Sequence, residues 1–230
     1  MPSLFRYKDY LKQIVYGGND GIVTTFAIVA GFAGADASGA GRIGALAVLV
    51  FGMANLLADA TSMGLGEFLS ARAARDMIRR KRADLAKNPS GQVKALTRHL
   101  QSHGLSTLDA TTMASLAATS PGLIAEMTLS QVEGLEDPGQ GKLWPRALIT
   151  FLAFVTFGVI PLLPYLLGAN AAIRTLAATG ATVSALVLLG LLRHVATRTS
   201  ALRAVGETVL VGGLCALVAY GVGIFVAGFG

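Results

Sequence analysis

The sequence predicts an all-α membrane protein with five transmembrane helices and a helical cytoplasmic insert between the second and third. Hydrophobic residues make up 53% of the 230-residue chain and charged residues only 14%, with a mean hydropathy of +0.60. A soluble domain would carry about a quarter charged residues. Five apolar runs approach or exceed the roughly 20 residues that a spanning helix needs, and one long polar stretch interrupts them.

The apolar runs set the domain boundaries. They lie at about residues 20–38, 43–69, 146–167, 171–192 and 205–228. The chain is therefore predicted to have three parts, which are an N-terminal segment with two spans (1–70), a cytoplasmic helical subdomain (71–144) and three further spans (145–230).

The distribution of basic residues predicts the orientation. With the N-terminus inside, all but two of the 19 Lys and Arg residues fall on the inner side, and only Arg42 and Arg174 lie outside. Short cytoplasmic segments carry such an excess, so we expect a cytoplasmic N-terminus and an external C-terminus. Topology thus explains the net charge of +6 without a nucleic-acid partner. The Ala- and Gly-rich composition favours a bacterial inner membrane.

A basic and aromatic N-terminal segment precedes the first span. Residues 1–18 suit either an interfacial helix on the inner leaflet or a simple anchor for the first span. Gly17 and Gly21 have the spacing that lets two membrane helices approach closely.

The insert is punctuated by helix signals. Asn88-Pro89 and Gly104 are stop signals, Ser106 is a capping residue, and Pro121 suits a first helical turn. Four helices are predicted, at about residues 71–87, 91–103, 106–119 and 121–134, followed by a linker at 137–141.

Proline and glycine shape the last three spans. Pro161 and Pro164 are expected to kink or end the third span, because proline removes a backbone donor. Glycines at 212, 213, 221 and 223 predict tight packing of the fifth. Cys215 is the only cysteine, which excludes an intrachain disulfide and a cysteine-rich metal site.

The second span carries the polar stripe on which the function prediction depends. Its members recur at every fourth position and climb about 18 Å along one helix face. They are Asn55, Asp59, Met63 and Glu67. An acid at mid-membrane depth costs at least roughly 2.5 kcal/mol on insertion scales, so acids on one face of a span indicate an ion pathway.

Topology places Asp20 and Glu207 at the same inner depth as Glu67, which predicts a cation mouth. Carboxylate and amide oxygens with a thioether favour Fe²⁺ or Mn²⁺ over Ca²⁺. Metal binding displaces protons from its ligands, which provides a mechanism for exchange. We therefore predict a transporter of divalent metal with no permanently bound cofactor.

Other interpretations of these residues remain open at this stage. Asp59 and Asn55 also suit hydrogen bonds between helices, Met63 suits a core, and Glu67 and Glu207 suit solvated helix ends. A second hypothesis is a non-transporting membrane protein whose basic insert recruits a partner or anionic lipid. An enzyme is disfavoured because neither a nucleophile with its base nor a nucleotide-binding loop is found.

Two motifs carry a family resemblance. Residues 19–27, NDGIVTTFA, and residues 62–70, SMGLGEFLS, are similar to the first- and second-helix signatures of the vacuolar iron transporter family. Residues 161–165, and Glu207-Thr208 with Gly212-Gly213, resemble its third and fifth helices, so the resemblance covers all five spans.

The resemblance implies a five-span homodimer that moves Fe²⁺ or Mn²⁺ out of the cytoplasm in exchange for protons, with the pathway at the dimer interface. The family's pathway aspartate falls on Asp20 and its methionine on Met63. Its second-helix glutamate falls on Asn55, and we hypothesise that Asp59, one turn on, restores the missing charge.

The insert departs further from the family. Iron-storing relatives carry glutamates on the first cytoplasmic helix, where this chain has residues 79–82, RRKR. Their Met-Met pair and following glutamate fall on Thr128, Leu129 and Val132. Candidate cytoplasmic metal ligands nearby are Glu126, Met127, Glu133 and Glu136. The insert is expected to bind metal poorly, to bind it differently, or to act only as a dimerising platform.

Overall fold

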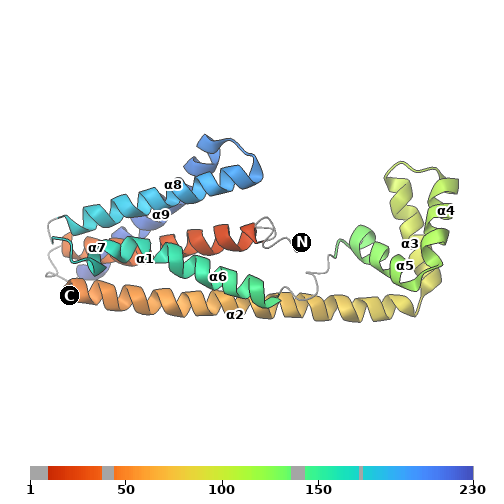
Figure 1. Cartoon of the computed structure of the whole chain (residues 1–230), viewed down its shortest axis with the longest axis horizontal. Helices are drawn as coiled ribbons and strands as arrows, with labels where there is room; N and C mark the ends of the chain where they lie inside the picture. Colours follow the sequence, from red (N-terminus) through yellow and green to blue (C-terminus); the bar gives the residue numbers. More distant parts are fainter. Residues whose placement is uncertain (1–9, 38–43, 136–142, 171–172, 230) are drawn as a thin grey trace, which may run out of the picture. The chain divides into compact units, whose positions relative to one another are not determined.

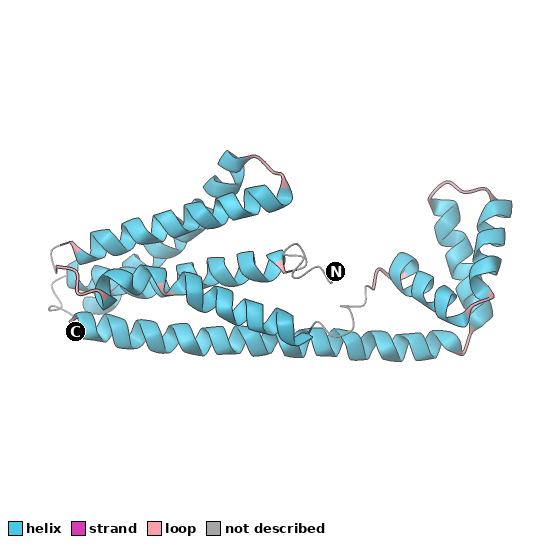
Figure 2. Ribbon diagram, viewed as in Figure 1, coloured by secondary structure: helices cyan, strands magenta, loops and turns pink. Residues whose placement is uncertain are grey.

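The computed structural model describes residues 10–37, 44–135, 143–170 and 173–229, with the side chain of residue 196 left out. Within these ranges the structure is helical, with short turns and loops and no strand (Figure 2). The elements are α1 (Leu11–Ala37), α2 (Ala45–Ala86), α3 (Pro89–Ser102), α4 (Thr107–Ala118), α5 (Pro121–Met127), a π-helical turn (Thr128–Val132), α6 (Leu143–Gly158), a 3-10 turn (Ile160–Leu162), α7 (Leu163–Leu166), α8 (Arg174–Thr197) and α9 (Ala201–Ala227) (Figure 1).

Among the described residues, five helical segments are long and apolar enough to cross a membrane, which agrees with the predicted number of spans. They are α1, α2, the segment from α6 to α7, α8 and α9. The chain groups into two compact units. One comprises Met1–Glu67 with Trp144–Gly230, and the other Phe68–Leu143.

Two boundaries differ from the sequence prediction. The first span begins at Leu11 rather than near residue 20, so residues 11–18 are part of α1 and not a separate interfacial helix; residues 1–9 lie outside the described part. The predicted helix at 71–87 is the continuation of α2, which runs unbroken to Ala86. Hydropathy marks where lipid ends, whereas backbone hydrogen bonding continues until Asn88-Pro89 stops the helix.

Side-chain caps define the short helices of the insert. Ser106 accepts a hydrogen bond from the Asp109 amide (3.1 Å), which confirms the predicted cap. Asn88, predicted only as a stop signal, also caps α3 by accepting a hydrogen bond from the Gly91 amide (2.9 Å). The predicted fourth helix is α-helical only to Met127 and continues as the π-helical turn. The core of this unit consists of Leu96, Ala114, Ala117 and Ile124.

Helix α1 packs closely against α6 and α9. A Cβ atom at Gly17 would lie 2.8 Å from the Thr150 carbonyl oxygen, and one at Gly21 would collide with the Phe154 carbonyl. Gly223 of α9 likewise meets the backbone of Gly31. The predicted close approach at these glycines is confirmed, and it fixes the depth of the neighbouring Asp20.

Proline divides the third span as expected. α6 ends at Gly158, the 3-10 turn holds Pro161, and the four-residue α7 follows with Pro164. Gly158 itself lies against α1, where a Cβ would come 2.8 Å from the Gly21 carbonyl oxygen. The break therefore follows directly after a close contact between α6 and α1.

Candidate functional site

The polar stripe of α2 lies at the edge of a buried helix contact. Each of its four residues is half-buried. Beside them, Leu56 and Ala60 are fully buried against Phe154 of α6, and Met63 packs on the margin of that cluster. Packing thus fixes the rotation of α2, and with it the direction in which the stripe points.

Asp20 and Asp59 come together from different helices. The two carboxylates interact electrostatically across α1 and α2. Asn55 donates a hydrogen bond from Nδ2 to Asp59 Oδ2 at 2.6 Å. No hydrogen bond or ion pair engages the Asp20 side chain within the described residues. Two interacting carboxylates repel each other, and a cation placed with them would offset that repulsion.

Glu67 has a partner that sequence reasoning missed. Gln13, near the start of α1, donates from Nε2 to Glu67 Oε1 at 2.9 Å and is only 6% exposed. Its Oε1 atom is buried and has no hydrogen-bond partner in the described part of the chain. One amide oxygen and one carboxylate therefore lie together at the Glu67 end of the stripe. Gln13 follows Lys12 on the first turn of α1, and no pattern in the sequence singled it out.

Glu207 lies elsewhere, in a charged cluster of its own. Its carboxylate pairs with Arg193 of α8 (Nη2 to Oε2, 2.8 Å) and with Arg203 of α9 (Nε to Oε1, 2.9 Å). No described contact joins it to Asp20 or Glu67. Two guanidinium groups already balance this carboxylate, which leaves it poorly suited to binding a metal.

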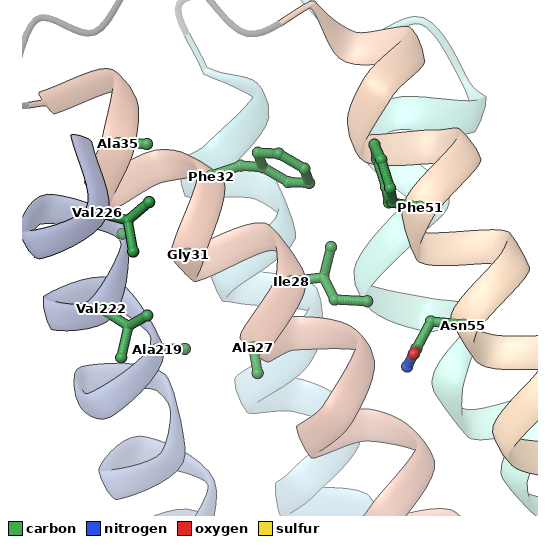
Figure 3. A pocket seen from close by; sticks show the side chains of 11 residues that line it. Ala27, Ile28, Gly31, Phe32, Ala35, Phe51, Asn55, Ala219, Val222 and Val226 are labelled. Carbon is green, nitrogen blue, oxygen red and sulfur yellow. The ribbon is translucent and has the colours of Figure 1, made fainter. Parts of the chain in front are cut away.

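An apolar pocket of about 620 Å³ adjoins the Asn55 end of the stripe (Figure 3). It is lined by α1, α2 and α9, and Asn55 is the one polar side chain among its lining residues. Phe32 and Phe51 face each other across it, with ring centroids 5.9 Å apart (Figure 3). An ion that reaches Asn55 from the stripe meets no further oxygen-bearing side chain in this lining.

The candidate ligands of the insert have other roles or are exposed. Glu133 pairs with Lys81 at 3.0 Å, Met127 packs on the insert core, and Glu126 is exposed. Glu136 lies outside the described residues. Across residues 10–37, 44–135, 143–170 and 173–229, no three His, Cys, Asp or Glu side chains gather closely enough to hold a metal ion.

Comparison with known proteins gives consistent matches along the chain. The VIT family model matches residues 11–224. A vacuolar iron transporter of Toxoplasma gondii is 33% identical over 94% of this chain and 74% of its own length. Vacuolar iron transporter 1 of Arabidopsis thaliana is 27% identical over 94% of this chain and 86% of its own length. Vacuolar iron transporter 1 of Oryza sativa is 26% identical over 94% of this chain and 85% of its own length.

Proposed function

Because the chain belongs to the VIT family, we propose that it transports a divalent metal ion, Fe²⁺ or Mn²⁺, out of the cytoplasm in exchange for protons. The names of its relatives support a metal-ion transporter rather than an enzyme. The single observation that carries the proposal is the approach of Asp20 to Asp59 between two helices apolar enough to span a membrane.

The ligand set is proposed to centre on those two acids. Asn55 supplies an amide oxygen and Met63 a thioether, and this mixture favours Fe²⁺ or Mn²⁺ over Ca²⁺. Glu67 with the free amide oxygen of Gln13 would receive the ion at the inner mouth. Glu207 takes part only when its two arginine partners release it.

A homodimer would complete the site. One chain brings only Asp20 and Asp59 together, and two carboxylates are few for stripping water from a doubly charged ion. A second copy of the chain that places its own polar stripe opposite this one would double the number of carboxylates at the site. The stripe is half-exposed in the single chain, which leaves room for such a partner.

Proton exchange follows from the same chemistry. Carboxylates must be deprotonated to bind metal, so binding releases protons. When the ion leaves, protons can take its place on the carboxylates that it releases. The excess of basic residues on one side supports a cytoplasmic N-terminus, with metal entering at the Glu67 end.

The proposal is tested by flux into liposomes that hold the purified full-length protein. Fe²⁺, kept reduced, is added outside, and lumenal Fe²⁺ and lumenal pH are followed with two dyes. We expect Fe²⁺ uptake above that of empty liposomes, faster when the lumen is acidic, with a simultaneous rise in lumenal pH. Uptake no faster than in empty liposomes would contradict transport, and uptake indifferent to the pH gradient would contradict proton exchange.

A further inference from the structure

A second pocket lies between α1, α8 and α9, away from the polar stripe. It encloses about 790 Å³. Its walls combine charged, polar and apolar side chains, which are Leu11, Lys12, Val15, Tyr16 and Asn19 of α1, Leu189, Arg193 and Thr197 of α8, and Glu207, Thr208 and Val211 of α9. We propose that this pocket binds the phosphate headgroup of an anionic phospholipid.

The charge of the pocket favours an anion. Lys12 is exposed and has no described ion pair, and Arg193 lines the same space. Arg203 is not a lining residue, but it pairs with Glu207, so the pocket and its margin carry three cations and one acid. Each guanidinium donates only one described hydrogen bond to Glu207, whereas the group has five N–H donors. Donors and net positive charge therefore remain for a phosphate.

The remaining wall suits a lipid better than a free ion. Leu11, Val15, Leu189 and Val211 give an apolar surface beside the cations. Tyr16 is 63% exposed, and tyrosine favours the depth of lipid headgroups. A phospholipid would place its phosphate near Lys12 and an acyl chain along the apolar side, while inorganic phosphate would use only the charged end.

The position in the fold agrees with this ligand. The pocket lies where α1 begins, α8 ends and α9 begins, the end that the basic residues predict to be cytoplasmic. That leaflet carries anionic lipids, and basic pockets between membrane helices bind their headgroups. The chain's own residues 1–9 are a poor alternative occupant, because Arg6 and Lys8 outnumber Asp9 and would repel the pocket.

Native mass spectrometry of the full-length protein, without added metal, tests the site. The detergent-purified protein is titrated with phosphatidylglycerol or with phosphatidylcholine of matched chains. We expect tighter binding of phosphatidylglycerol, weakened about fivefold by Lys12→Gln, since one cation beside an anionic surface contributes about that factor. Arg203→Gln should weaken the binding of phosphatidylglycerol similarly, because it also removes one cation. Glu207 keeps its ion pair with Arg193 in this variant, so the carboxylate is not left unpaired. Lys94→Gln on the exposed face of α3 is the matched control and should change nothing.

Three results would overturn the site. Equal binding of the two lipids would remove the preference for an anion, and unchanged binding by Lys12→Gln and Arg203→Gln would place the lipid elsewhere. Complete displacement of phosphatidylglycerol by excess inorganic phosphate would show that the pocket recognises phosphate alone. Because no metal is present, a failure here is separate from any failure of transport.

Discussion

Replacing Asp20 with asparagine is expected to abolish Fe²⁺ flux. The side chain keeps its size and loses its charge, so the packing set by Gly17 and Gly21 should survive. The change removes one of two acids that a desolvated cation needs. The loss of flux should exceed the roughly 10–100-fold that is lost when a hydrogen-bond partner of a metal ligand is removed. The measurement is the initial rate of Fe²⁺ uptake into liposomes.

A matched variant separates site chemistry from a general loss of charge. Asp84→Asn changes an exposed acid on α2 that pairs with Lys87 at 2.8 Å, within the Phe68–Leu143 unit. It should transport at the wild-type rate, and both variants should elute from size exclusion as the wild type does. Flux by Asp20→Asn within a few-fold of wild type would contradict the role given to this carboxylate.

The second large effect is expected at Asp59, whose carboxylate is proposed to supply the negative charge that Asn55 lacks. Asp59→Asn should reduce uptake by more than the roughly 10–100-fold that losing a hydrogen-bond partner of a metal ligand costs, since it leaves a single acid near the ion. The double variant Asn55→Asp with Asp59→Asn moves the carboxylate one helical turn and keeps one amide and one acid. It should recover most of the lost rate, because the hydrogen bond between the two positions can form in reverse.

The exchanged pair also tests the rival hypothesis of a non-transporting protein. If Asp59 served only a hydrogen bond, Asp59→Asn would leave every function intact. If the carboxylate had to be at position 59, moving it to position 55 would not help, and the double variant would be as slow as Asp59→Asn. Either outcome would contradict charge compensation along the stripe, and the two are distinguished by uptake rate alone.

The membrane architecture was largely predictable, because apolar runs and prolines act locally. Five runs of sufficient length became five candidate spans, and Pro161 interrupts the third where the missing donor requires it. The helix boundaries were less predictable. α2 continues through its charged half to Ala86 because nothing before Asn88-Pro89 breaks its hydrogen bonding.

The partners of the acids were not predictable, because they depend on helix rotation. Their predicted depth in the membrane alone placed Glu67 and Glu207 in the same cation mouth. The packing of α8 against α9 gives Glu207 two arginines, whereas Glu67 receives the amide of Gln13. Among the predicted ligands, a hydrogen bond joins Asn55 to Asp59, and Asp20 interacts electrostatically with Asp59; a shared metal site at these residues stays a prediction.

The most direct test is to locate the metal itself. Crystals of the full-length protein soaked in Fe²⁺ or Mn²⁺, with diffraction recorded at the metal's absorption edge, would show the ion as an anomalous peak. We expect a peak between Asp20 and Met63, within coordination distance of Asp59, that is absent from Asp20→Asn crystals. A peak found only in the 71–144 insert, with Asp20 and Asp59 each held by other side chains, would contradict a shared cation site within the membrane helices.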